Sequence, residues 1–254
     1  MEFFGADWQA LLPFVAVGFF AQLIDGALGM AFGAIAATLL VGVMGVTPAR
    51  ASYQIHIVKC FTTAASGVSH AFSGNVDRRI FVLVAVPGVL GGAIGAYGLA
   101  QVDGEAIKPF VFAYLGLLGL LLIRKGRRTV TTRNRPRGAA PLGFVGGILD
   151  AIGGGGWGPV VSSGLMLQGT EPRKVVGSVN AAEFFVAIAI SASFLSHFGF
   201  EDFTRATLGL LIGGVIAAPF GALAARYLPA PVMLILIGTV LAGTSIYWFV
   251  DALL

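Results

Sequence analysis

Apolar runs long enough to cross a lipid bilayer follow one another along nearly the whole of this 254-residue chain, with only brief polar segments between them. Hydrophobic residues make up 57% of the chain and charged residues 11%, whereas an ordinary soluble domain is about 25% charged. The mean hydropathy is +0.89. We therefore expect an all-α polytopic membrane protein with no sizeable water-soluble domain.

Several common kinds of site are excluded by the sequence. The chain has one cysteine, Cys60, so it can form neither an internal disulfide nor a multi-cysteine metal site. Gly153, Gly155 and Gly158 match G-x-G-x-x-G, but no strand-helix-strand unit surrounds them, so they do not predict dinucleotide binding. The chain also lacks a G-x-x-x-x-G-K-[ST] sequence for ATP. We predict no cofactor and no metal.

Basic residues are concentrated near the middle of the chain. Seven of the 16 fall within residues 124–137, and no acidic residue occurs between Glu105 and Asp150. In a membrane protein such a stretch indicates a cytoplasmic segment rather than a nucleic-acid site. We therefore predict a basic cytoplasmic linker over residues 124–140. The N-terminal sequence lacks the basic region and cleavage site of a signal peptide and is expected to remain in the mature chain.

The linker separates two halves, residues 1–123 and 141–254, that can be aligned with each other. Coincidences at matching spacing indicate an internal duplication, which is a common plan of secondary transporters. The aligned pairs are Asp25 with Asp150, Gly33 with Gly158, His56 with Asn180, and Lys59 with Glu183.

Three segments of each half are long enough to cross the membrane, and the first segment of each half is interrupted. The predicted spans are 51–72, 80–101 and 107–123, then 175–197, 205–226 and 231–250. Residues 142–168 are split by Gly153 to Gly156 into pieces that reach only mid-depth, which predicts a re-entrant hairpin. The matching hairpin, 11–46, breaks near Asp25 to Gly29 and is longer, so two full crossings remain an alternative there.

The distribution of basic residues favours an inverted repeat. A hairpin plus three crossings per half leaves 12 basic residues inside and three outside, whereas four crossings per half leave ten and five. The first arrangement better satisfies the positive-inside tendency. An odd number of crossings inverts the second half, so both termini are expected in the periplasm. The two broken segments should then enter from opposite faces and meet near the middle.

The glycine run in the second half predicts an anion site. Irregular backbone at membrane depth must be buried in protein or line a wet cavity. The half-helix that follows would direct its N-terminal amides toward the middle of the membrane. We expect Gly153, Gly154, Gly155, Gly156 and the amide of Trp157 to bind an anion. Close helix packing is the alternative explanation of the glycines.

Lys59 lies near the middle of its predicted span, where an ammonium costs roughly 2.5–3.5 kcal/mol to insert. It therefore needs a partner, which is either a substrate anion or Glu183 in a plain ion pair. His56, one turn earlier, could bind the anion or carry a proton, and a packing role is its alternative. Asn180 would add a hydrogen bond.

Three acidic residues are candidates for coupling transport to a proton. Asp25 and Asp150 immediately precede the chain breaks, where each could instead cap a half-helix by accepting backbone amide hydrogens. Glu183 is the third candidate.

These motifs resemble the TauE/SafE family of sulfite exporters, also described as sulfonate-uptake-type permeases. The resemblance covers nearly the whole chain and rests on two D-x-x-x-G modules, on SHAFSGNVD and on ILDAIGGGGWGPVV. It implies a transporter of small sulfur-containing anions, such as sulfite or organosulfonates, in the bacterial inner membrane. The first module lacks the full glycine run, which favours the second as the binding segment.

The sequence thus predicts a secondary transporter, preferably an exporter, that works by alternating access. The alternatives are a passive anion channel, a membrane subunit of a larger complex, and an intramembrane serine hydrolase built from Ser162 or Ser163 with His197. The glycine-rich faces also allow a homodimer. No nucleic-acid partner is expected.

Overall fold

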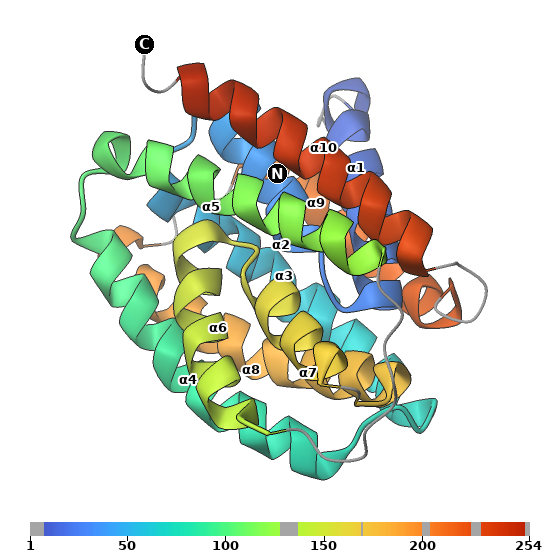
Figure 1. The fold of residues 1–254 in the computed structure, drawn as a ribbon. Coiled ribbons are helices and arrows are strands. Elements are labelled where there is room, and N and C mark those ends of the chain that lie inside the picture. Colours follow the sequence, from blue (N-terminus) through green and yellow to red (C-terminus); the bar gives the residue numbers. More distant parts are fainter. Residues whose placement is uncertain (1–7, 128–136, 169, 200–203, 225–229, 252–254) are drawn as a thin grey trace.

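The computed structural model describes residues 8–127, 137–168, 170–199, 204–224 and 230–251, and all regular structure in these residues is helical (Figure 1). Two of the segments, η1 and η2, are π-helices. The elements are α1 (Trp8–Leu28), α2 (Phe32–Ala37), η1 (Thr38–Val43), α3 (Pro48–Phe72), α4 (Arg78–Ala100), α5 (Gly104–Gly126), α6 (Ala139–Gly153), η2 (Gly158–Ser162), α7 (Ser163–Leu167), α8 (Pro172–Phe198), α9 (Arg205–Ala224) and α10 (Ala230–Asp251).

Four of the described helices are long and apolar enough to cross a membrane: α1, α4, α5 and α8. Helix α3 has 25 residues, but its polar side chains, Lys59 among them, lower its hydropathy. The six predicted spans fall on α3, α4, α5, α8, α9 and α10, although residues 225 and 226 lie outside the described part of the chain. An all-helical, multi-pass membrane protein is therefore confirmed. Most of the predicted basic linker, residues 128–136, also lies outside the described residues.

Each long helix packs most closely against partners from the other half of the chain. The closely packed pairs are α1 with α9, α4 with α6, α5 with α10, α3 with α8, α4 with α8, and α3 with α9. Exchanging α1 for α6, α3 for α8, α4 for α9 and α5 for α10 turns this set of pairs into itself.

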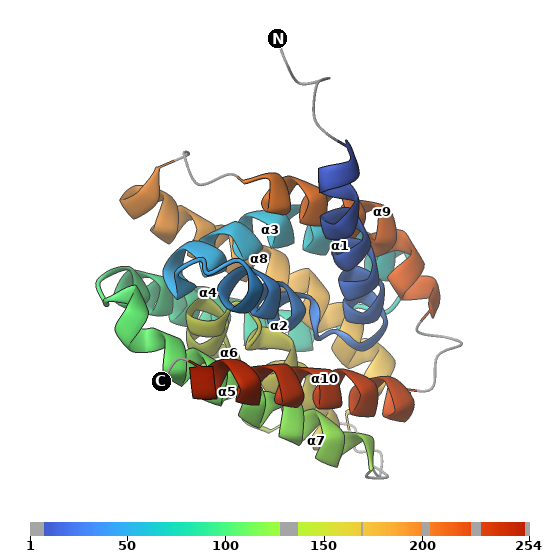
Figure 2. The ribbon, with the colours of Figure 1, turned by 90° about the horizontal axis from the view of Figure 1, so that it is seen from above.

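The relative directions of the packed helices are also unchanged by this exchange of helices. Helices α5 and α10 lie side by side and run in opposite directions in both views (Figures 1 and 2). Gly119 faces Ala242 while Gly238 faces Ile123, so the residue numbers rise along one helix as they fall along the other. Helices α1 and α9 instead run in the same direction, as do α4 and α6.

The two broken segments have one local structure. Helix α1 ends at Leu28 and α6 ends at Gly153, and each is followed by a glycine in the left-handed region. Gly29 and Gly154 both have φ of 68°. The Gly29 amide donates to the Asp25 carbonyl at 2.6 Å, and the Gly154 amide donates to the Asp150 carbonyl at 2.7 Å. A left-handed residue of this kind ends a helix at little cost only when it is glycine.

The positions of the breaks differ slightly from the prediction. Asp25 lies inside α1 rather than in the break, because the helix continues until Gly29 reverses the chain. Gly153 likewise belongs to α6. Helix α1, with 21 residues, is roughly 32 Å long and can cross the hydrocarbon core, whereas the 15 residues of α6 reach roughly 22 Å.

The two breaks meet inside the bundle, backbone against backbone. A methyl group added to Gly33 would lie 2.6 Å from the Gly154 carbonyl carbon and 2.8 Å from the Gly155 Cα. A methyl group on Gly158 would lie 2.5 Å from the Met30 Cα. Glycine is therefore required at this crossing, because no larger residue leaves room for the opposing backbone.

Candidate functional site

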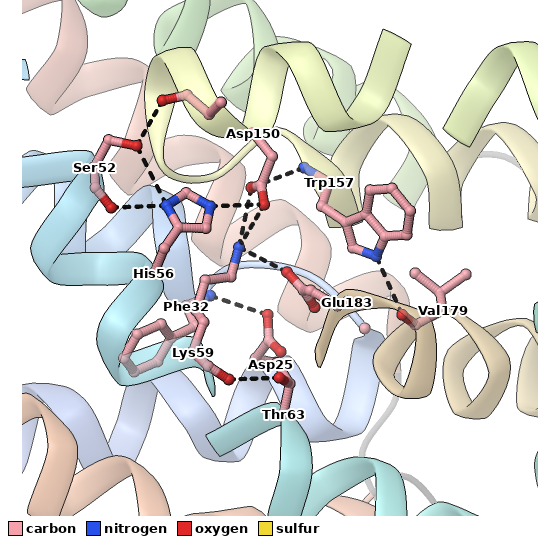
Figure 3. A network of polar contacts seen from close by, with 12 residues as sticks. Asp25, Phe32, Ser52, His56, Lys59, Thr63, Asp150, Trp157, Val179 and Glu183 are labelled. Carbon is pink, nitrogen blue, oxygen red and sulfur yellow. Dashed lines mark hydrogen bonds and ion pairs between the residues drawn. The ribbon is translucent and has the colours of Figure 1, made fainter. Parts of the chain in front are cut away.

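Lys59 is buried beside the crossing and forms ion pairs with two carboxyl groups (Figure 3). Its Nζ lies 3.0 Å from both carboxylate oxygens of Asp150 and 2.7 Å from Glu183 Oε1. The residue is only 2% exposed. The ion pair considered from the sequence, Lys59 with Glu183, is therefore present. The structure adds Asp150, which the sequence pattern did not connect with Lys59.

His56 lies on the same face of α3 and also contacts Asp150. Its Nε2 is 3.0 Å from Asp150 Oδ2, and its Nδ1 is 2.7 Å from the Ser52 carbonyl oxygen. Both ring nitrogens thus face acceptors, so either His56 is doubly protonated or Asp150 holds the second proton. Ser52, which sequence analysis missed, donates its hydroxyl to the Ala151 carbonyl at 2.5 Å. The available signal was its position one turn before His56.

Asp150 joins the break to this group of side chains. Its Oδ1 accepts the Trp157 amide at 3.1 Å, which caps the helical segment after the break. The same carboxylate accepts from Lys59 and contacts His56, and it is fully buried. The groups expected to bind an anion, the Lys59 ammonium, His56 and the Trp157 amide, therefore surround the Asp150 carboxylate in this conformation.

Asp25 performs the same capping role at the first break but has fewer partners. Its Oδ1 accepts the Phe32 amide at 3.1 Å, as Asp150 accepts the Trp157 amide. Within the described residues, Asp25 Oδ2 has no hydrogen-bond partner. Glu183 Oε2 likewise has none there. Both side chains are at least 97% buried, so each leaves one carboxyl oxygen without compensation.

Asn180 lies at the first break, away from Lys59. Its Oδ1 accepts from Ser66 Oγ at 3.2 Å, and its Nδ2 donates to the Val176 carbonyl at 3.1 Å. A methyl group on Gly29 would lie 3.5 Å from the Asn180 Nδ2. The alignment of His56 with Asn180 could have indicated this, because it assigns the two residues to different breaks.

The tetraglycine run lies at the crossing, beside Asp150. A methyl group on Gly153 would meet the Tyr114 ring at 2.7 Å, and one on Gly155 would lie 2.7 Å from the Ala34 Cα. Its glycines therefore serve close packing. Their expected contact with an anion stays a prediction.

The serine and histidine considered for hydrolysis do not meet at Ser162. Ser162 is buried and donates to the Gly29 carbonyl at 3.0 Å. His197 lies at the exposed end of α8, where its Nε2 is 3.0 Å from Gln101 Nε2. In the described part of the chain, the hydrogen-bond partner of Ser162 is thus a carbonyl and not the adjacent base that a serine nucleophile needs.

Comparison with known proteins agrees with this architecture. The model of the family described as "Sulfite exporter TauE/SafE" matches residues 14–248. No solved structure gave a significant match.

Named relatives support the same assignment. The "Probable membrane transporter protein YtnM" of Bacillus subtilis (strain 168) is 40% identical over 239 residues, which are 91% of this chain and 79% of that protein. A "Probable membrane transporter protein" of Xylella fastidiosa (strain Temecula1 / ATCC 700964) is 24% identical over 252 residues, covering 94% of this chain and 95% of the relative. The chain is a membrane transporter protein that belongs to the TauE/SafE family of sulfite exporters.

Proposed function

We propose that the protein is a secondary transporter that moves a small sulfur-containing anion, such as sulfite or an organosulfonate, across the bacterial inner membrane by alternating access. Export is the direction that the family's description suggests. The observation that carries the proposal is the buried Lys59, held beside the crossing of two broken segments. An ammonium in the membrane interior is expensive and marks functional pathways.

An inverted repeat would supply the two equivalent gates that alternating access needs. Three observations support it: the exchange-symmetric set of helix pairs, the antiparallel packing of α5 with α10, and the shared structure of the two breaks. In this arrangement the basic linker over residues 124–137 is cytoplasmic and both termini are periplasmic.

The substrate anion would take over donors that Asp150 now occupies. The Lys59 ammonium, His56 and the Trp157 amide already converge on one carboxylate, and a sulfite or sulfonate group offers oxygen acceptors of the same kind. When the substrate takes these donors, Asp150 would lose its bond to the Trp157 amide across the break after α6. Substrate binding would thereby be linked to movement of this break. The glycines of the run would let an anion approach the backbone.

The test is a variant that removes the ammonium. Lys59→Gln should abolish binding of sulfite and methanesulfonate, measured as the ligand-induced rise in melting temperature of the purified protein. Lys174→Gln is the matched control, because Lys174 bonds the Gly74 carbonyl at an exposed position. It should bind like wild type. Unchanged affinity in folded Lys59→Gln would contradict the proposal.

Loss of the lysine leaves two carboxyl groups without their cation, which could unfold the protein. The double variant Lys59→Gln/Glu183→Gln removes one of those acids and provides a second folded background. Reconstituted in vesicles, wild type should accumulate the anion at carrier rates. Large single-channel currents would instead identify a passive channel and overturn alternating access.

A further inference from the structure

The buried group around Lys59 contains more acidic than basic residues. Three carboxyl groups gather there, from α1, α6 and α8, as Figure 3 shows for Asp25, Asp150 and Glu183. One ammonium and one imidazole face them. Even with His56 fully charged, one carboxylate has no compensating cation among the described residues. An uncompensated charge at this depth costs several kcal/mol, so at least one acid must hold a proton.

The hydrogen bonds indicate which of the three carboxyl groups hold the proton. Asp150 is bonded by Lys59, by the Trp157 amide and by His56, so it is stabilised as a carboxylate. Asp25 has its one amide bond from Phe32 and an unpartnered Oδ2. Glu183 shares Lys59 with Asp150 and has an unpartnered Oε2. The charge of Asp25 also acts on Glu183, so both acids cannot stay ionised cheaply.

The two halves explain how this asymmetry arises. The exchange that relates the breaks places Asp25 where Asp150 is, Glu183 where Lys59 is, and Asn180 where His56 is. Asp150 thus faces two basic groups, whereas the matching positions opposite Asp25 hold a second acid and a neutral amide. One copy of the motif is an ion pair, and the other aligns two acids.

We propose that Asp25 and Glu183 form a proton-binding acid pair that carries the coupling proton of transport. This inference rests on the proposed function for its role in coupling, but the proton site itself does not require transport. When the anion binds near Lys59, the ammonium's bond to Glu183 weakens. The pair then retains its proton, so anion and proton move together, and the outward gradient of the anion drives export.

Other titratable groups near the pair are few. They are Lys59, His56 and Cys60 on α3, His70 on α3 beside Gly26, Tyr114 on α5 and Asp150 on α6. The facing stretches of α4 (residues 80–96) and α9 (residues 206–224) contain no ionisable side chain. Helix α2 contains none either. Besides Asp150, Asp25 and Glu183 are therefore the carboxyl groups that can take up the proton here.

Infrared spectroscopy of purified protein tests the proton site without transport. Wild type at neutral pH should show the carbonyl stretch of a buried protonated carboxyl, shifted in heavy water. Asp25→Asn and Glu183→Gln should each weaken this band, and the double variant should lose it. Glu171→Gln, at an exposed loop position, should leave it unchanged. A neutral-pH spectrum without the band, or a band unaffected by both substitutions, would overturn the proposal.

Folding of these variants is expected, because each removes a surplus acid and leaves the Lys59–Asp150 pair intact. Size-exclusion profiles and melting curves check this. Glu183→Asp keeps an acid at the position and should keep the band at a shifted frequency. A Glu183→Asp spectrum that lacks the band, while Glu183→Gln retains it, would contradict the assignment.

Transport in vesicles then tests coupling. Methanesulfonate is a suitable probe because it stays ionised across the accessible pH range. A pH gradient should drive its accumulation by wild type and by Glu171→Gln, whereas Asp25→Asn and Glu183→Gln should exchange it without gradient-driven accumulation. Accumulation driven by sodium rather than by pH would overturn the coupling role. If no anion is transported at all, the proposed function fails, while the infrared result still decides the proton site.

Discussion

Substitution of Gly33 by alanine should destabilise the protein strongly, because it forces apart the two backbones at the crossing. The added methyl group would lie 2.6 Å from the Gly154 carbonyl carbon and 2.8 Å from the Gly155 Cα, and it would also clash with the Gly154 carbonyl oxygen. Ordinary contacts between carbon atoms are about 3.5–4.0 Å. The opposing atoms belong to backbone, so no side chain can rotate away, and the two segments must separate by about 1 Å.

Overpacking of a dense core typically costs about 1–3 kcal/mol, and occasionally more. Three backbone atoms are too close here, so we expect the upper end of that range, about 3 kcal/mol. The measurement is the free energy of unfolding of the purified protein in detergent, from reversible denaturation. Gly98→Ala is the matched control, since nothing lies within 4 Å of a methyl group there and Gly98 is inside α4. It should be neutral or slightly stabilising.

Equal stability of Gly33→Ala and Gly98→Ala would refute the reasoning, because it would mean that the two breaks do not touch. Gly33→Ser is a stricter version of the same test, as its hydroxyl needs still more room. Anion binding should also weaken in folded Gly33→Ala, since the shift displaces the segment next to Asp150.

Three further substitutions test other parts of the structure. Asp77→Ala removes the side chain that accepts two amide hydrogens at the start of α4, and should lower the free energy of unfolding by about 1 kcal/mol in denaturation curves. An unchanged free energy of unfolding would contradict this cap. Ser191→Cys places a second thiol beside Cys60, whose Sγ is 3.6 Å from the serine oxygen, so mild oxidation should form a disulfide visible by mass spectrometry; two free thiols would contradict the packing of α3 on α8. Trp157→Phe leaves the Val179 carbonyl without its 3.1 Å indole donor and should cost about 1–3 kcal/mol in melting experiments, whereas wild-type stability would contradict this contact.

The long helices could be predicted from the sequence because lipid imposes a simple requirement on them. A span must be apolar and about 20 residues long, and α4, α5 and α8 satisfy this with little ambiguity. The breaks were also visible, as glycines after an aspartate. Their exact ends were not, because Asp25 stays helical and its carboxylate reaches forward to the Phe32 amide.

The central ion pairs were only partly predictable. Depth along a span identifies Lys59 as a residue that needs a partner, and the alignment of the halves indicates Glu183. The contact with Asp150 depends on the register of α3 against α6, which are separated by about 90 residues of chain. Hydropathy gives lengths and not registers, so this partner and the supporting Ser52 were missed. Asn180 lies at the first break, and the hydrogen bond to an anion that we expect from it stays a prediction.

The most direct test of the account is equilibrium exchange of radiolabelled sulfite by wild type and Lys59→Gln in matched proteoliposomes. Wild type and Lys174→Gln should show rapid, saturable exchange, and Lys59→Gln should show none above empty vesicles. Exchange by Lys59→Gln at the wild-type rate would show that the buried ammonium is structural and that the anion crosses elsewhere.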